Sequence, residues 1–285
     1  MTFMITLVVG LGLIGGSIAR RLRGFHDTKI IGVDKNSISL QSALADGVID
    51  EGYPLADGIV EQADFVILCL YPQANIAFAR QYARDFKKGA VITDVSGVKE
   101  TVVKEISEAL PPDVDFVGGH PMAGREVGGY QSSTDTLFDG ASYLFTPTQK
   151  NHPESVSMLR EFAEYIGCSH VVTTSPEEHD AMIAYTSQLM HVVAVALCNH
   201  PMLERSAFFS AGSLRDCTRI AVINEKMWSE LFLENKNALM GRIEEFCETL
   251  QQFRDALASD DRDALEEMMR IATRQKQTWL MEKQN

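Results

Sequence analysis

The chain has 285 residues, of which 45% are hydrophobic and 23% are charged, and its formal net charge at pH 7 is −13. This composition is typical of a globular protein that buries one large core or two smaller ones, and it excludes a disordered chain. The acidic balance argues against a nucleic-acid-binding surface and against a basic membrane-binding patch.

The first forty residues combine two apolar runs with a glycine-rich turn. The run at 5–9 leads into Gly-Leu-Gly-Leu-Ile-Gly, a helical pattern follows, and a second apolar run ends at Asp34. In such a turn Gly10 permits a tight bend, Gly12 lets backbone approach a pyrophosphate, and Gly15 lets the helix pack closely. The free N–H groups at the start of the helix attract the anion. The residues predicted to bind the cofactor are Gly10, Gly12, Leu13, Ile14, Gly15 and Asp34.

Asp34 lies where an acidic side chain accepts hydrogen bonds from the adenosine ribose hydroxyls of a dinucleotide. A 2′-phosphate would meet this carboxylate, so the pattern favours NAD as the cofactor. Two other interpretations stay open, namely FAD on the same motif and a glycine turn without a ligand. The agreement of strand, helix and acid disfavours the second of these.

Strands and helices alternate to about residue 172, which predicts an α/β domain over residues 1–172. Its sheet is expected to be doubly wound, largely parallel and of Rossmann type, because 65–70 is a continuous apolar run and 90–94 begins with another. The predicted strands are 4–9, 29–34, 65–70, 90–94, 115–117, 143–146 and 170–172. The predicted helices are 14–23, 38–46, 74–85, 98–109 and 154–166.

Residues 173–285 are expected to form an all-α domain. Ser175-Pro176-Glu177-Glu178 is a capping box for a helix that runs to about Asn199, and its apolar part at 189–197 is expected to be buried. A heptad seam follows at Leu239, Ile243, Phe246, Leu250, Phe253 and Leu257, and a last helix carries Leu265, Met268, Ala272 and Trp279. Such seams predict association between subunits, a homodimer through this domain, or equally a bundle within one chain.

The cysteine pattern and the N-terminal residues indicate the cellular compartment of the protein. The five cysteines are scattered without metal-ligand spacing, which indicates reduced thiols, no metal site and a cytoplasmic protein. No basic residue precedes the first apolar run, and glycines interrupt it, so it is not a signal peptide. No segment has 18 consecutive apolar residues, so no membrane span is predicted.

Two polar segments follow predicted strands of the sheet. One is a glycine-rich loop around His120, and the other runs from Asp94 to Lys99 and contains Ser96. Ligands of such sheets bind at the carboxyl ends of the strands, so both segments are expected beside the nicotinamide. A histidine there can take a proton from a hydroxyl as hydride leaves, although a loop histidine bonded to backbone is the alternative.

The helical part contains two arginines in a segment that starts at Gly212. Arg215 and Arg219 could bind carboxylates through their guanidinium groups, but from this segment alone two solvated arginines are the more common outcome. His191, on an otherwise apolar helix, is by itself more often a core histidine than a ligand.

Together these motifs resemble the prephenate dehydrogenase family, which includes arogenate and cyclohexadienyl dehydrogenases. In the family's order the chain has G-x-G-x-x-G-G-S, D-V-x-x-V-K, G-G-H-P-M-A-G-x-E, S-x-L-x-H and G-x-x-R-D-x-T-R-I-A. The resemblance covers nearly the whole chain, and the third and fifth motifs are its most specific parts.

The resemblance implies NAD⁺-dependent oxidative decarboxylation of prephenate, a small molecule with two carboxylates, to 4-hydroxyphenylpyruvate in tyrosine biosynthesis. It assigns His120 to the ring hydroxyl as hydrogen-bond acceptor and base. It assigns Arg219 to a substrate carboxylate, with Asp216 orienting it, and His191 to the substrate side chain. Glu126 becomes the acid that gates the pocket, and Gly212 joins the predicted substrate-binding residues.

The clearest departure of the chain from the family is in one loop. The family usually reads D-x-G-S-x-K, where its serine bonds the catalytic histidine, whereas this chain has Ser96 followed by Gly97. We expect Ser96 to reach the histidine from one position earlier, with backbone and water as the alternative.

Three other functions stay open at this point. An arogenate dehydrogenase would give tyrosine directly. A hydroxy-acid or imine reductase would share the two-domain plan but would leave the motif around His120 unexplained. A non-catalytic NAD-sensing dimer would leave both His120 and Arg219 without a role.

Overall fold

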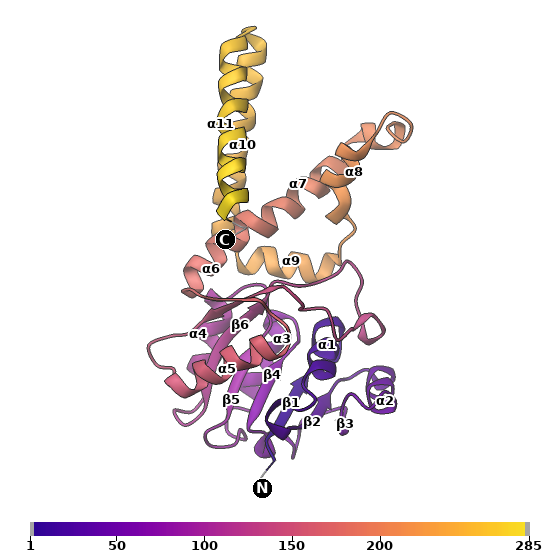
Figure 1. Ribbon diagram of the computed structural model, residues 1–285, viewed down its shortest axis with the longest axis vertical. Coiled ribbons are helices and arrows are strands. Elements are labelled where there is room, and N and C mark those ends of the chain that lie inside the picture. Colours follow the sequence, from indigo (N-terminus) through magenta and orange to yellow (C-terminus); the bar gives the residue numbers. More distant parts are fainter. Residues whose placement is uncertain (1–2, 283–285) are drawn as a thin grey trace. The chain divides into compact units, whose positions relative to one another are not determined.

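The computed structural model describes residues 3–282 and contains two compact units, which divide at residue 236. The first unit is built on an eight-stranded sheet (Figure 1) with the order β3-β2-β1-β4-β5-β6-β7-β8. Every neighbouring pair is parallel except β6 and β7. The strands are β1 (Ile5–Val9), β2 (Lys29–Val33), β3 (Glu51–Tyr53), β4 (Phe65–Leu68), β5 (Val91–Asp94), β6 (Asp115–Pro121), β7 (Ser142–Thr146) and β8 (His170–Thr173).

Helices cover both faces of this sheet, as expected for a doubly wound fold. Alternate side chains of β1 enter different cores: Val8 joins one with helix residues such as Ile18 and Phe162, whereas Leu7 joins the other with Ile76 and Val102. The helices among the strands are α1 (Leu13–Arg21), α2 (Ser37–Ala45), α3 (Pro72–Gln81), α4 (Glu100–Ala109) and α5 (Pro153–Tyr165). The predicted Rossmann-type fold is therefore confirmed.

The strand β6 is longer than predicted and changes the place of His120. The prediction of a loop there was wrong, because His120 lies in β6 and pairs with Leu144 of β7. The two glycines before it are needed for packing: a Cβ on Gly118 would lie 2.4 Å from the Thr146 hydroxyl oxygen, and one on Gly119 would lie 2.7 Å from that of Tyr143. Strand β3 was not predicted.

The helical part of the first unit consists of α6 (Pro176–Ile183), α7 (Leu189–Cys198), α8 (Gly212–Thr218) and α9 (Glu225–Glu234). Ser175 caps α6 as predicted, its hydroxyl accepting from the Glu178 N–H. Burial of the apolar stretch at 189–197 is not found in the single chain, where only Leu189 and Ala194 are buried. The reason is that, within the first unit, α7 packs mainly against η4, η6 and α8, which leave its outer sides uncovered.

By length and composition, the run Pro176–Cys198 could cross a membrane. Core helices pass the same test. Here His179, Asp180 and Gln188 are buried and hydrogen-bonded within the first unit, so we interpret the run as a helix of its core.

The second unit contains two long helices, α10 (Lys236–Ala258) and α11 (Arg262–Glu282). The predicted heptad positions lie on α10 and the last helix is α11. In the single chain Leu250 and Leu257 of the seam are exposed, whereas Leu239 is buried.

Candidate active site

The glycine turn between β1 and α1 has the geometry that a pyrophosphate requires. Gly10 has φ of +94°, and a Cβ there would lie 2.8 Å from the carbonyl oxygen of Cys69. A Cβ on Gly15 would lie 1.8 Å from the carbonyl oxygen of Gly10, whereas the space beside Gly12 is open. Leu13 and Ile14 begin α1, so their N–H groups belong to the positive end of that helix.

Asp34 follows β2 beside this turn. Its Oδ2 accepts from the Leu11 N–H at 2.7 Å, and its Oδ1 accepts from the Asn36 N–H at 2.8 Å. The carboxylate is only half-buried, so it keeps room to accept hydrogen bonds from ribose hydroxyls. All six predicted cofactor residues therefore lie together at one end of β1 and β2.

His120, near the carboxyl end of β6, is the first member of a chain of three side chains. Its Nδ1 lies 2.9 Å from Nε2 of His179, and Nδ1 of His179 lies 2.7 Å from Oδ1 of Asp180. Burial, then His179 and then Lys99 hold the pKa of His120 well below its ordinary value. The imidazole of His120 is therefore neutral at pH 7 and able to accept a proton.

A buried ion pair lies beneath this chain. Lys99 Nζ lies 2.6 Å from Oδ2 of Asp94, and both side chains are fully buried. The same carboxylate accepts from the N–H groups of Ser96 and Gly119, so it joins the end of β5 to the strand that carries His120. Burial lowers the pKa of Lys99, and Asp94 opposes that shift.

The loop between β5 and α4 places Ser96 and Gly97 differently from each other. The Ser96 hydroxyl is buried and accepts from Asn75 Nδ2 at 3.0 Å. A Cβ on Gly97 would lie 3.9 Å from Cε1 of His120 and 3.5 Å from the Leu231 side chain. Position 97 therefore faces the histidine, and Ser96 has another partner.

The other predicted substrate residues gather around α7 and α9. His191 stacks on Trp228 with ring centroids 3.6 Å apart, and its Nδ1 donates to the Ser187 carbonyl at 3.0 Å. Burial lowers the pKa of His191, and the charges of Arg219 and Glu126 also act on it. One polar cluster therefore joins α7, η6 (Arg219–Ala221) and the loop after β6.

Arg219 and Glu126 form an ion pair across this cluster. Arg219 Nη1 lies 2.6 Å from Oε1 of Glu126, and the two side chains are 68% and 47% exposed. Asp216 pairs with Arg215 at 3.4 Å, so the ion-pair partner of Arg219 is Glu126. Gly212 starts α8, and a Cβ there would lie 3.8 Å from Oδ2 of Asp216.

A single π turn, η4 (Ala184–Gln188), joins α6 to α7. At about 100° per residue, an uninterrupted α-helix would separate positions 179 and 191 by about 120° around its axis. A π turn holds roughly one extra residue, which takes back about 100°. The two histidines therefore lie on nearly the same face of this long helix.

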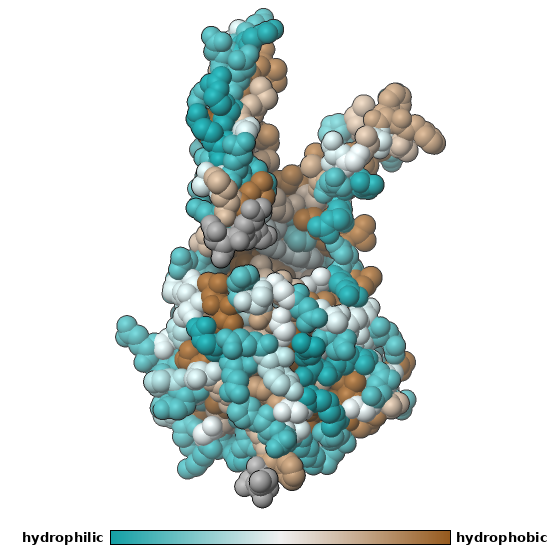
Figure 2. Space-filling model, viewed as in Figure 1, coloured by the Kyte–Doolittle hydropathy of each residue, from teal (hydrophilic) through white to brown (hydrophobic). Residues whose placement is uncertain are grey.

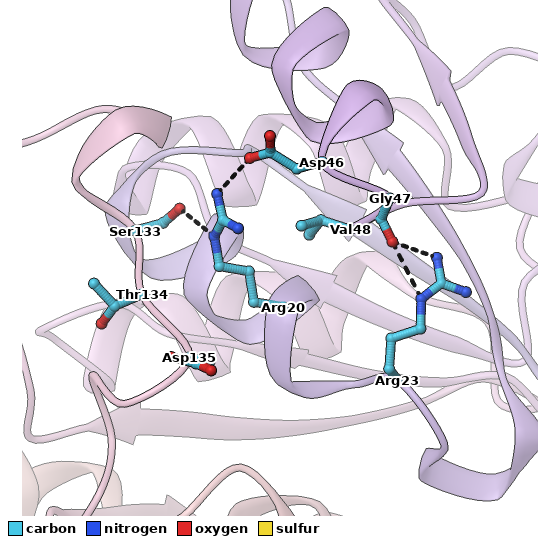
Figure 3. Close-up of a pocket in the computed structure, with 8 residues that line it drawn as sticks. All are labelled: Arg20, Arg23, Asp46, Gly47, Val48, Ser133, Thr134 and Asp135. Atoms are coloured by element: carbon cyan, nitrogen blue, oxygen red, sulfur yellow. Dashed lines mark hydrogen bonds and ion pairs between the residues drawn. The ribbon is translucent and has the colours of Figure 1, made fainter.

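A pocket on the sheet side is separate from these residues (Figure 3). It is lined by Arg20, Arg23, Asp46, Gly47, Val48, Ser133, Thr134 and Asp135. Both arginines already bind neighbouring oxygens, Arg20 with Asp46 and Arg23 with the Gly47 carbonyl. The pocket lies at the far end of α1 from the glycine turn, so it is not the nucleotide site.

The sequence analysis missed His179 and Asp180. They come directly after the capping box that it identified, but a histidine and an aspartate in the first turns of a helix usually face solvent. Their role follows from packing of α6 against α4, because Asp180 accepts from the N–H groups of Lys99 and Glu100.

A dinucleotide turn with a neutral histidine at the carboxyl edge of the same sheet defines a nucleotide-dependent dehydrogenase. Comparison with known proteins identifies the class more closely. A model of the prephenate dehydrogenase nucleotide-binding domain matches residues 18–172, and a model of the prephenate dehydrogenase dimerization domain matches residues 175–271. The chain belongs to the prephenate dehydrogenase family. The expected resemblance and the enzyme class, an NAD-dependent oxidoreductase, are confirmed.

Individual relatives agree with this assignment. A prephenate dehydrogenase of Bacillus subtilis is 34% identical over 91% of this chain and 71% of its own length. A cyclohexadienyl dehydrogenase of Zymomonas mobilis is 32% identical over 90% of each chain. The structure of prephenate dehydrogenase from A. aeolicus, in complex with hydroxyphenyl propionate and NAD⁺, has a TM-score of 0.88 and 31% identity. It covers 98% of this chain and 99% of that chain.

Proposed function

We propose that this protein catalyses the NAD⁺-dependent oxidative decarboxylation of prephenate to 4-hydroxyphenylpyruvate. The observation that carries the proposal is the neutral His120 at the carboxyl end of β6, on the sheet that also bears the dinucleotide turn. Its Nδ1 is engaged by His179, which leaves Nε2 to face a ligand. The relative from Bacillus subtilis supports the choice of substrate.

In the reaction, Nε2 of His120 accepts the hydrogen bond and then the proton of the ring hydroxyl as hydride leaves the same carbon. The bound NAD⁺ supplies the hydride acceptor. The ring carboxylate departs as CO₂, and its bonding electrons complete the aromatic ring. The proton returns to the ring oxygen, so that prephenate and NAD⁺ give 4-hydroxyphenylpyruvate, CO₂ and NADH.

The polar cluster around α7 supplies the substrate contacts in this proposal. Arg219 binds one carboxylate of prephenate through its guanidinium group, as suits a planar bidentate partner. In this proposal Glu126 gives up Nη1 of Arg219 to the substrate carboxylate, so their ion pair acts as the gate. Nε2 of His191, which has no hydrogen-bond partner among residues 3–282, meets the substrate side chain, with its ring held against Trp228.

We also propose that residues 1–172 bind the nucleotide and that residues 173–285 bind substrate and join two copies into a homodimer. Figure 2 shows hydrophobic surface at the outer end of the arm that α7 and α8 form. Phe208 is fully exposed and Phe209 is 92% exposed in the single chain. Surfaces of this kind mark contacts with another chain. Five free cysteines and use of NAD⁺ fit a cytoplasmic enzyme.

The test is a direct assay with purified protein, prephenate and NAD⁺, following NADH by absorbance and the product by chromatography. We expect NADH, CO₂ and 4-hydroxyphenylpyruvate in equal amounts, and no reaction without NAD⁺. Parallel reactions with arogenate and with NADP⁺ determine the preferred side chain and cofactor. Turnover of arogenate alone would reassign the substrate, and binding of NAD⁺ without turnover of either would favour a non-catalytic NAD sensor.

A further inference from the structure

The side chains of His179 and Asp180, which follow His120 in the chain of hydrogen bonds, are buried in the interior of the first unit. His179 is 1% exposed and Asp180 is 2% exposed. The Asp180 carboxylate accepts from the Lys99 N–H at 2.8 Å and from the Glu100 N–H at 2.9 Å, where α4 begins. This carboxylate therefore has a fixed position and a fixed role as acceptor, because backbone N–H groups can only donate.

The position of protons along the chain follows from that fixed end. Asp180 accepts, so His179 carries its proton on Nδ1 and donates it to Oδ1. Burial lowers the pKa of His179, so this imidazole is neutral and its Nε2 is an acceptor. His120 must then carry its own proton on Nδ1 and donate it to Nε2 of His179. Nε2 of His120 is left with its lone pair.

We propose that His179 and Asp180 are positioning residues that hold His120 as the tautomer whose Nε2 accepts the substrate hydroxyl proton. The inference rests on the proposed function, because it gives that function the residues that orient its base. Among residues 3–282, no group hydrogen-bonds Nε2 of His120, so this nitrogen is available to a ligand.

The same arrangement stabilises the charge that the reaction creates. When His120 takes the proton on Nε2 it becomes a cation, and its Nδ1–H still donates to His179. The negative charge of Asp180 lies one imidazole further along and favours that cation. Lys99 opposes it, but Asp94 neutralises Lys99 through their direct ion pair. No net proton transfer to His179 is needed, because the proton returns to the ring oxygen of the product.

The arrangement also explains how the active site functions with glycine at position 97. Where a serine hydroxyl could orient the base, this chain has no side chain, and Ser96 bonds to Asn75. The orientation of His120 therefore depends on its Nδ1 partner, which makes His179 the residue to test.

Nuclear magnetic resonance of the enzyme with ¹⁵N-labelled histidine tests the tautomer directly, without substrate. Long-range ¹H–¹⁵N correlations, assigned with His120→Asn and His179→Gln, should show protonated Nδ1 and bare Nε2 for both residues at pH 7.5. A protonated Nε2 on His120 would overturn the proposal. Because this measurement needs no turnover, it gives its answer even if prephenate is not the substrate.

Kinetics of three variants test the consequence for catalysis. His179→Leu removes the acceptor and should lower kcat about 10²- to 10³-fold while KM for prephenate stays within about threefold. His179→Gln offers an amide oxygen to His120 and an amide N–H to Asp180, so it should recover kcat to within about tenfold of the parent. His170→Leu removes an exposed histidine of β8 and should leave both constants unchanged.

A folded His179→Leu enzyme with kcat within threefold of the parent would overturn the proposal, as would equal losses in the Leu and Gln variants. If His179→Leu does not fold, the tautomer of His120 in the parent enzyme decides. Absence of prephenate turnover in the parent enzyme would instead contradict the proposed function. The tautomer of His120, measured by nuclear magnetic resonance, would then decide whether His179 and Asp180 are positioning residues.

Discussion

The sheet and the helices α6 to α9 belong to one unit but bury their side chains very differently. Strand β4 is fully buried along its length, and cores fill both faces of the sheet. In α8 and α9, by contrast, no residue is buried. The sheet is therefore stable through its own packing, whereas the helical part of a single chain leaves apolar side chains in water.

The buried polar groups follow the same division. Those of the helical part, His179, Asp180, Gln188 and Asn235, are hydrogen-bonded to one another or to the loops at the carboxyl edge of the sheet. These helices are thus anchored to the carboxyl edge of the sheet through buried polar groups, and their outer sides are exposed in the single chain. This difference fits our proposals that the chemistry takes place at the edge of the sheet and that copies associate through the outer ends of the helices.

The largest effect is expected from removing the base on the sheet. His120→Asn should lower kcat roughly 10²- to 10⁴-fold, because general base catalysis is lost, while the affinity for NADH stays unchanged. Steady-state kinetics and fluorescence titration with NADH measure the two quantities. Near-normal kcat in this variant would show that the reaction does not use His120, and His170→Asn serves as the matched control.

The second largest effect is expected on stability, from breaking the buried ion pair between Lys99 and Asp94. Lys99→Met leaves the Asp94 carboxylate buried without its cation, which should lower the free energy of unfolding by about 3–5 kcal/mol. Urea denaturation followed by circular dichroism measures the loss. The double variant Lys99→Met/Asp94→Asn should recover part of it, because no unpaired charge remains. A loss below about 1 kcal/mol in the single variant would contradict the importance of the pair.

Substitutions on the exposed surface of the helical part are expected to weaken the dimer. Replacing Phe208 and Phe209 by serine removes rings that would each contribute about 1.5–3 kcal/mol when buried, so the dissociation constant of the dimer should rise at least about tenfold. Sedimentation equilibrium measures this constant. Leu55→Ser, on the sheet side, is the matched control for loss of an exposed apolar side chain. Unchanged sedimentation of the double variant would place the interface elsewhere.

A smaller effect is expected at the exposed gate. Arg219→Ala should raise KM for prephenate about tenfold, equivalent to about 1.4 kcal/mol, with little change in kcat. The effect is smaller than for a buried pair because Arg219 is 68% exposed and its pair with Glu126 is accessible to water. Arg219→Lys should restore part of the affinity. A fall in kcat without a change in KM would assign Arg219 to the chemical step.

The smallest effect concerns stability against pH. The pKa values of His120, His179 and His191 are lowered by burial, so the folded protein binds these protons less well than the unfolded chain. Their contribution is complete above the ordinary histidine pKa of about 6.5 and is lost as the pH falls below it. The melting temperature should therefore decline between pH 7 and pH 5, and less steeply in His179→Gln. An equal slope in both proteins would contradict this origin.

The sequence was sufficient for the sheet and the cofactor turn because each has a local pattern. Continuous apolar runs identify β4 and β5, and three glycines with Asp34 identify the turn. Strand β3 has no such pattern, because Glu51, Gly52 and Tyr53 do not alternate. The predicted strand at 115–117 ends too early, because a pair of glycines usually breaks a strand. In β6 the pair Gly118 and Gly119 continues the strand, because a larger side chain at either position would clash with side chains of β7.

The sequence predicted several individual residues of the candidate site but not the side chains that contact His120. His120, His191, Glu126 and Arg219 were named from motifs, and the structure brings the last three into one cluster. The partner of His120 depends on α6 packing against the start of α4, a contact between residues about eighty positions apart. No spacing along the chain encodes such a contact, so His179 and Asp180 could only be found in three dimensions.

The π turn between α6 and α7 sets a limit on how this chain can change in length. This turn spans Ala184–Gln188 and holds about one residue more than a turn of α-helix. Deletion of one residue there would restore regular α-helical winding and still leave the two histidines within about 20° of each other around the helix axis, because the extra residue of the turn adds no net rotation. A deletion elsewhere between the two histidines, with the π turn kept, would instead rotate His191 by about 100° away from the side that His179 occupies. Loss of a residue from this long helix should therefore be confined to the π turn or to the helix ends.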